Sequence, residues 1–184
     1  SNLVAGDTNN AGEVFVHDRQ TGSTNRVAVN STGDQGNNSS DSPRLSADGR
    51  YVAFSSPASN LVSGDTNNVS DVFVHDRQTG VTTLVSVSST GEKGNFWSDY
   101  PTLSADGRFV VFMSGSTNLV TGDSNGYVAD VFVHDRQTGV TSRISESSAG
   151  DQGNGSSDGP TLSADGHFVA FQSAASNLVT GDTN

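Results

Sequence analysis

The nine-residue sequence VFVHDRQTG occupies residues 14–22 and recurs without a change at residues 72–80 and 131–139. The sequence around each copy recurs as well, including LSADG at residues 45–49, 103–107 and 162–166. Identical segments at a near-constant spacing predict a tandem array, in which one supersecondary unit is stacked repeatedly. We therefore interpret the fold from the repeat and look for function where the copies differ.

A second motif, Ser/Thr-Asn-Leu-Val, defines the period of the array. Its asparagines are spaced 58, 58 and 59 residues apart, at Asn2, Asn60, Asn118 and Asn177. The additional residue falls in the segment 122–130, which is one residue longer than its counterparts 64–71 and 6–13. An insertion between constant flanks predicts that this segment is an exposed loop and that its flanks are packed.

The composition of the 184-residue chain favours a protein of short strands and many turns. Only 32% of the residues are hydrophobic, Gly is abundant and Cys is absent, which excludes disulfides and thiolate metal sites. No apolar run approaches the roughly 20 residues of a membrane span. No signal peptide is visible and the one methionine, Met113, is internal, so we expect a mature protein or an excised segment.

The formal net charge of −11 argues against nucleic acid as a partner, because phosphate binding depends on Lys and Arg. Cations are the charged partners that such a chain favours. A negative surface that only keeps a secreted protein soluble is the alternative.

Each repeat carries signals for four strands and none for a helix. Short aromatic and β-branched runs follow Asp-Gly, a tight-hairpin signal, at residues 51–54, 109–112 and 168–171. The run 72–74 leads into DRQTG, where Asp and Thr can bond their own backbone and Gly supplies a positive φ. We expect a fourth strand at residues 82–88, with counterparts near 25–29 and 141–145.

Four antiparallel strands (A to D), two tight hairpins and two long loops per repeat predict an all-β fold, a β-propeller of four-stranded blades. A parallel β-solenoid is the main alternative, although its coils are usually shorter. We expect one domain over residues 1–184, with complete blades at 43–100 and 101–159. A third blade is split between strands C and D in 1–42 and strands A and B in 160–184.

The segments PTLSADGRFVVF (101–112) and DVFVHDRQTG (130–139) resemble the TolB-type, WD-like propeller repeat. The resemblance covers essentially the whole chain and implies the propeller fold. It implies little about function, because such propellers serve as scaffolds, binding proteins and accessory domains of peptidases. Two features depart from the family pattern: Ala47, Ala105 and Ala164 replace the usual Pro, and the B-to-C and D-to-A loops are long. Long Asp/Asn-rich repeats of this kind resemble those of bacterial secreted or surface proteins.

Three blades are fewer than the four to eight of a usual propeller ring, so we expect the two half-blades not to meet within one molecule. Their unpaired sheet edges would invite association. The sequence therefore predicts a homodimer that closes a six-bladed ring, with the C–D hairpin of one chain completing the A–B hairpin of the other.

The B-to-C loop GDTNNVSD (64–71) is the strongest candidate for a metal site. Asp65, Asn67 and Asp71 supply hard oxygens that can converge on one cation, and calcium tolerates irregular oxygen shells better than magnesium does. The loop resembles the calcium-binding hairpin loops of integrin-type propellers. The corresponding residues of the other copies are Asp7, Asn9 and Glu13, then Asp123, Asn125 and Asp130, and Asp182 begins a further copy.

An EF-hand is excluded because Asp76, twelfth from Asp65, follows an extended strand that carries it away from the ion. Ordinary turn chemistry, in which Asp and Asn cap their own loop, is the alternative to calcium. We expect structural roles for the one His of each strand C (His17, His75 and His134). The following arginines, Arg19, Arg77 and Arg136, are expected to pair with a carboxylate of a neighbouring blade. No nucleophile elbow is present, so we expect no enzymatic activity.

The D-to-A loop differs most between the copies. The middle copy carries Phe96, Trp97 and Tyr100 where the others have small polar residues. In a propeller this loop lies on the same face as the B-to-C loop, so the rings predict a protein or glycan contact near the cation sites. The alternative is a hydrophobic rim or a subunit contact.

The sequence thus predicts a secreted, cell-surface or periplasmic propeller module without enzymatic activity, which acts as a scaffold or binding protein. The alternatives are a lectin-like propeller and an accessory propeller domain of a secreted hydrolase.

Overall fold

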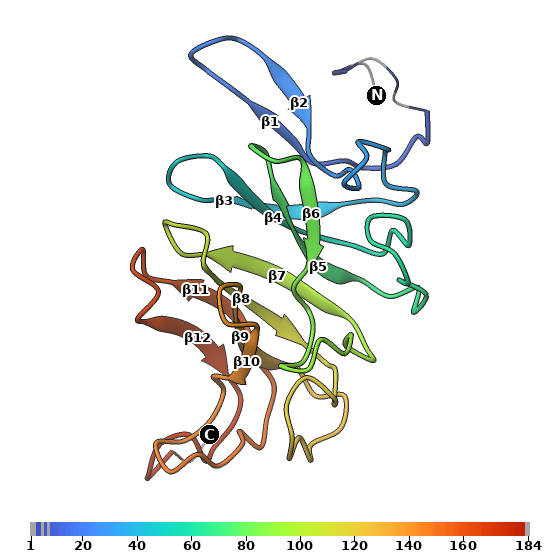
Figure 1. The fold of residues 1–184 in the computed structure, drawn as a ribbon. Helices are drawn as coiled ribbons and strands as arrows, with labels where there is room; N and C mark the ends of the chain where they lie inside the picture. Colours follow the sequence, from blue (N-terminus) through green and yellow to red (C-terminus); the bar gives the residue numbers. More distant parts are fainter. Residues whose placement is uncertain (1–2, 5, 7, 183–184) are drawn as a thin grey trace.

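The structure is a computed structural model that describes residues 3, 4, 6 and 8–182. The described residues form an all-β fold of antiparallel strands (Figure 1). In chain order the strands are β1 (Phe15–His17), β2 (Thr24–Arg26), β3 (Asp41–Leu45), β4 (Tyr51–Ser56), β5 (Asp71–Asp76), β6 (Val81–Leu84), β7 (Ser98–Leu103), β8 (Phe109–Ser114), β9 (Asp130–Asp135), β10 (Val140–Arg143), β11 (Ser157–Leu162) and β12 (Val169–Ser173).

Two sheets contain four strands each, in the orders β3-β4-β5-β6 and β7-β8-β9-β10. The sheets at the two ends of the row, β1-β2 and β11-β12, contain two strands each. Within each sheet, strands that follow one another in sequence pair antiparallel, which confirms the predicted four-stranded blades and contradicts the parallel solenoid.

The tight turns form where Asp-Gly and Asp-Arg-Gln-Thr-Gly predict them. In the β3–β4 turn, the Ser46 hydroxyl donates to Asp48, whose carboxylate also accepts the Arg50 backbone N–H, and Gly49 adopts a φ of 70°. In the β5–β6 turn, Gly80 donates its N–H to the Asp76 carbonyl and has a φ of 74°. A residue with a Cβ is strained in this left-handed region, so glycine is required in both turns.

The fourth strand of each blade is shorter than the sequence predicts. β6 ends at Leu84, because the following residues fold into a small turn in which Val87 bridges to Lys93. The Gly94 N–H donates to the Ser86 carbonyl and fastens this turn. The D-to-A connection therefore begins earlier than expected.

Successive sheets pack face to face, and the core lies between them. Between the first two sheets, Val14 and Val16 of the β1 segment contact Val52, Phe54 and Phe73. The same kind of layer lies between the two four-stranded sheets and contains Val72, Val74, Val110, Phe112 and Phe132. The paired phenylalanines are stacked in both layers, with centroids 5.8 Å apart for Phe54–Phe73 and 6.1 Å for Phe112–Phe132.

The A strands of neighbouring blades, β3, β7 and β11, lie side by side. Their A–B turns are joined by backbone hydrogen bonds, from Ala47 N–H to the Ala105 carbonyl and from Ala105 N–H to the Ala164 carbonyl. This arrangement, with A strands gathered and D strands apart, is that of blades in a propeller.

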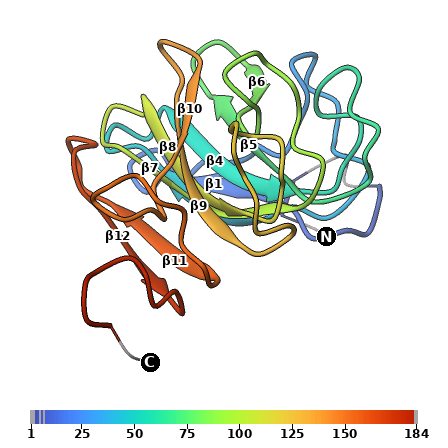
Figure 2. The same ribbon diagram turned by 90° about the horizontal axis from the view of Figure 1, so that it is seen from below.

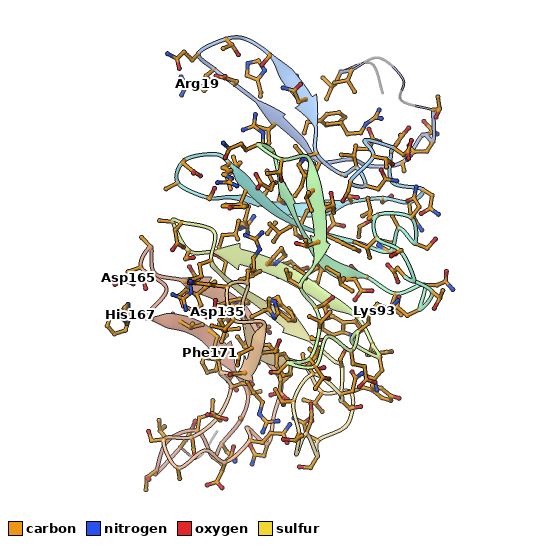
Figure 3. All side chains as sticks on the ribbon, viewed as in Figure 1. Arg19, Lys93, Asp135, Asp165, His167 and Phe171 are labelled. Carbon is orange, nitrogen blue, oxygen red and sulfur yellow. The ribbon has the colours of Figure 1, made fainter. Side chains whose placement is uncertain are left out.

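The short turns and the long loops lie on opposite faces. Figure 3 shows Arg19, Asp165 and His167 on the side of the short turns, whereas Lys93 lies on the other side among the long loops. The predicted common face of the B-to-C and D-to-A loops is confirmed, because the Asn60 side chain donates to the Gln35 carbonyl at 2.8 Å.

Candidate functional site on the long-loop face

An asparagine joins two long loops in three copies of the repeat, and the fourth copy, Asn2, lies outside the described residues. The carboxamide of Asn118 accepts from the Asn95 N–H at 2.9 Å and donates to the Lys93 carbonyl at 2.8 Å. Asn60 and Asn177 make the same pair of bonds in the neighbouring copies. This role was missed at the sequence level, although the constant Ser/Thr-Asn-Leu-Val motif was the signal for it.

In the second B-to-C loop, the side chains predicted to bind calcium lie together but have protein partners. The Asn67 carboxamide donates to Asp71 Oδ2 at 2.8 Å, and the Lys93 ammonium lies 3.1 Å from Asp65 Oδ1. Lys93 also donates to the Gly64 carbonyl at 2.6 Å. A side-chain cation is therefore already present in this loop.

The third loop has the same architecture with an amide in place of the ammonium. Gln152 donates to both Asp123 Oδ1 and Asp130 Oδ2, each at 2.9 Å. Asn125 donates to Asp130 Oδ2 at 3.1 Å, and its own Oδ1 is buried without a hydrogen-bond partner. Two carboxylates thus share one neutral donor beside an unsatisfied oxygen.

The first loop is closed by a salt bridge. Glu13 accepts from Arg26 Nε at 2.8 Å and also from the Gln35 amide, while Asn9 donates to the Gly36 carbonyl. The third copy has Arg143 at the position of Arg26 and the shorter Asp130 at the position of Glu13, and the Nε and Nη1 of Arg143 are buried without a hydrogen-bond partner. Of the remaining predicted ligands, Asp182 is partly buried and Asp7 lies outside the described residues.

Burial makes the carboxyl group of Asp71 a weak acid. The residue is fully buried at the start of β5, and loss of solvation raises its pKa to about 6. Hydrogen bonds from Ser86 and Asn67 act in the opposite direction, favouring the carboxylate. The nearby Asp65 carboxylate adds to the increase of the pKa, so the two acids repel each other in this loop.

The fit to a metal differs between the loops. Among residues 8–182 no three His, Cys, Asp or Glu side chains gather as a ligand set, so any cation would depend on carboxamide and backbone oxygens as well. The third loop offers such a mixture, and its two carboxylates accept hydrogen bonds from the neutral Gln152. The first and second loops already hold a guanidinium and an ammonium, respectively.

An aromatic cluster lies beside these loops. The ring of Phe96 lies 4.6 Å from that of Tyr127 and 6.4 Å from that of Trp97, measured between centroids. Tyr127 is 63% exposed. It was missed at the sequence level, although it lies in the loop with the additional residue. Tyr100, which the sequence grouped with Phe96 and Trp97, lies in β7 and is also exposed.

The C-strand histidines of the two complete blades are packed as the sequence predicts, whereas His17 of β1 is exposed and shares a 2.8 Å hydrogen bond with Thr24. His75 and His134 each share a 2.9 Å hydrogen bond through Nδ1 with the threonine opposite, Thr82 or Thr141. Burial lowers the pKa of both imidazoles. They lie on separate blades, one on each.

The C–D arginines of the two central blades interact electrostatically with a carboxylate of a neighbouring blade, Arg77 with Asp18 and Arg136 with Asp76, but among the described residues they form no close ion pair with it. Arg136 donates to the Gly107 carbonyl at 2.7 Å, and its guanidinium lies 4.5 Å from the ring centroid of Tyr51 in the neighbouring blade. The hairpin carboxylates are bound instead by the arginine that follows each Asp-Gly turn. Arg108 donates two bonds to Asp135, of 2.9 and 2.7 Å, and Arg50 binds Asp76 in the same way.

Comparisons with known proteins support the fold. No protein-family model and no curated protein matches the chain. Among solved structures, the match to the tricorn protease covers 90% of this chain and 13% of the protease chain, with 14% identity and a TM-score of 0.57. A putative TolB from Agrobacterium tumefaciens matches 73% of this chain and 38% of its own, with 22% identity and a TM-score of 0.45. The match to TolB from Acinetobacter baumannii covers 88% of this chain and 48% of the TolB chain, with 18% identity and a TM-score of 0.28.

The matched regions span less than half of each of these solved chains. The similarity to the tricorn protease, together with the four-stranded antiparallel sheets, supports propeller-type blades. In the described part of the chain, no helix is long and apolar enough to cross a membrane.

Proposed function

We propose that the chain is a non-enzymatic propeller module that acts as a scaffold or binding protein in a closed ring of six blades. The observation that supports this role most directly is the long-loop face, where the exposed ring of Tyr127 and the partly buried rings of Phe96 and Trp97 lie beside carboxylate-rich loops. Rigid sheets that present variable loops are a usual design for binding. We place the protein outside the cytoplasm, as a secreted, cell-surface or periplasmic module, on the basis of its acidic Asp/Asn-rich repeats.

The cluster of Phe96, Trp97 and Tyr127 is the contact surface of this proposal. Flat rings stack on sugars and on apolar protein groups, and neighbouring Asn side chains can bond hydroxyl groups. Because Trp97 is the one tryptophan of the chain, its fluorescence reports ligand binding at this face directly.

A glycan array and a fluorescence titration test this surface. We expect the chain to bind a subset of glycans or a protein ligand, with a change in Trp97 emission. Replacing Tyr127 with Ala should weaken binding by roughly ten-fold or more, as for a stacking residue at a binding hot spot. Val81→Ala, on the outer strand of another blade, is the matched control. Equal affinity of the two variants would contradict the assignment of this surface.

We also propose that calcium binds in the third B-to-C loop. Asp123, Asn125 and Asp130 would hold the ion through their oxygens, and the ion would neutralise the two carboxylates that now share Gln152. In the second loop the ammonium of Lys93 already has this electrostatic role. The second loop, with the ammonium of Lys93, can therefore be compared with the third loop, where a calcium ion would supply the positive charge.

Variants that exchange the amide of Gln152 and the ammonium of Lys93 between the two loops test the calcium proposal. For the unmodified chain, calcium at 100 times its Kd should add about 2.7 kcal/mol to the free energy of unfolding and raise the melting temperature. Gln152→Lys should abolish this increase, whereas Lys93→Gln should add a second site and enlarge it. A melting temperature that calcium and chelator leave unchanged in all three proteins would overturn the proposal.

A further inference from the structure

The sheet β11-β12 leaves side chains exposed that are buried in the two complete blades. Val52, Ala53 and Phe54 of β4 are fully buried, as are their counterparts in β8. The corresponding residues of β12 are partly or fully exposed, because in the described part of the chain no strand pairs with β12 in the place of β5 or β9. Figure 2 shows β11 and β12 at one end of the row of sheets.

The opposite end of the row has the complementary deficit. Phe15 of β1 is partly exposed, although Phe73 and Phe132 at the same repeat position are fully buried. Leu45 of β3 is 52% exposed, whereas its counterpart Leu103 is 9% exposed and packs in the layer that contains Ala53. Each end of the row therefore lacks a neighbouring half-blade, and the half-blade at the other end has the sequence of the missing one.

The hairpin β1–β2 has the sequence that pairs with the B strand in both complete blades. Residues 14–22 are identical to 72–80 and 131–139, and the latter two segments pair with β4 and β8. The register of these pairs is the same, with Phe54 opposite Phe73 and Phe112 opposite Phe132. Applied to β12, this register places Phe171 opposite Phe15 and Ala170 opposite Val16.

The short turns show the same complementarity. A Cβ on Gly107 would lie 2.3 Å from the Tyr51 ring, and one on Gly166 would lie 2.4 Å from the Phe109 ring, so an aromatic residue covers each turn glycine from the preceding blade. Gly49 has no such cover, and Phe168 is 75% exposed. The pattern continues if Phe168 of one molecule covers Gly49 of another.

We propose that the occupant of the β12 edge is the β1–β2 hairpin of a second copy of this chain, paired in the register of β4 with β5. The inference rests on the proposed propeller ring and names the partner that closes it. Each copy supplies two complete blades and two halves, so two copies make six blades. One copy would make three and three copies nine, both outside the usual range of four to eight.

The two-fold arrangement uses both ends of the row at once. In each joint, β12 of one copy pairs with β1 of the other, and Leu45 and Gly49 pack against Ala170 and Phe168 of the other copy. The ends of one molecule are separated by two complete blades, as Figure 1 shows, so the hairpin of the same copy does not reach its own β12. Main-chain pairing supplies attraction at the edge, and the phenylalanines supply the buried layer.

Site-specific disulfide formation tests the register, because the chain contains no cysteine. Chains with Val16→Cys and chains with Ala170→Cys are mixed and oxidised mildly. We expect a covalent dimer in the mixture and none from either variant alone. Ala53→Cys with Val74→Cys in one chain is the positive control, since these residues are opposite each other in a complete blade. Gln172→Cys replaces Ala170→Cys as the out-of-register control.

A second pair of variants tests the packing between copies. Leu45→Lys and Phe168→Lys alter side chains that are exposed in the single chain, so folding should be unaffected. We expect each to raise the Kd of the dimer at least ten-fold in sedimentation experiments. Val140→Lys, at a 48% exposed position on an outer strand, should leave it unchanged.

A synthetic peptide of residues 13–29 separates failure of this inference from failure of the ring. A chain that stays monomeric and forms no cross-link, but whose β12 edge binds the peptide, would overturn the second copy as partner and leave ring closure intact. A chain that neither dimerises nor binds the peptide would overturn both.

Discussion

Replacing Phe132 with Ala should lower the free energy of unfolding by about 3–5 kcal/mol, the cost of removing a large buried ring from a core. Phe132 is fully buried and stacks on Phe112 between two complete blades. The surrounding side chains relax only partially into the space, so a cavity remains. Chemical denaturation of the variant, compared with the unmodified chain, measures the loss.

The matched control for this prediction is Val140→Ala, on an outer strand. It should change the free energy of unfolding by less than about 1 kcal/mol, as for most exposed positions. If Phe132→Ala cost as little as the control, the sheets would not be packed face to face as described.

The buried carboxyl group of Asp71 should make stability fall as the pH rises from about 4 to 7, while His75 and His134, whose pKa burial lowers, act in the opposite direction. The pKa of Asp71 is raised to about 6 in the folded chain from an unfolded value near 3.8. The contribution is therefore fully present below the unfolded pKa and is lost as the pH rises through about 6. A difference of about 2 pKa units corresponds to roughly 3 kcal/mol. Denaturation at a series of pH values measures it.

Asp71→Asn should remove the contribution of Asp71, because the amide stays neutral throughout, and should leave the opposing contribution of the two histidines. Asp34→Asn, which alters an exposed carboxylate in a turn, should leave the contribution of Asp71 in place. Below about pH 4 the trend reverses, since hydrogen bonds from Arg50 and Arg108 lower the pKa of Asp76 and Asp135 and their contribution disappears on protonation. An unchanged slope between pH 4 and 7 in the Asp71→Asn protein would contradict the assignment to this residue.

Much of the fold could be predicted from the sequence because its signals are local. Asp48-Gly49 and Asp76 to Gly80 encode turns through their own side chains and backbone angles, and the identical copies then fix the number of strands. The end of the D strand could not be predicted in this way, since β6 stops at Leu84 on account of a turn bridged by Val87 and Lys93. That turn depends on contacts with the B-to-C loop.

The site was harder to predict because it depends on contacts between loops far apart in sequence. The Asp/Asn pattern identified residues 65–71, but nothing in the loop itself indicates that Lys93 reaches Asp65 while Gln152 bridges Asp123 and Asp130. The aromatic contact of Tyr127 with Phe96 likewise joins two different loops. The pairing of the hairpin carboxylates has the same origin, since Asp76 and Asp135 are bound by Arg50 and Arg108 from the turn before strand B.

Native mass spectrometry of the unmodified chain tests the central claim, that two copies close one ring of six blades. The account predicts a dominant species of twice the mass of one chain, which persists on dilution until both joints separate together. A dominant monomer at micromolar concentration, or a ladder of ever larger oligomers, would contradict it.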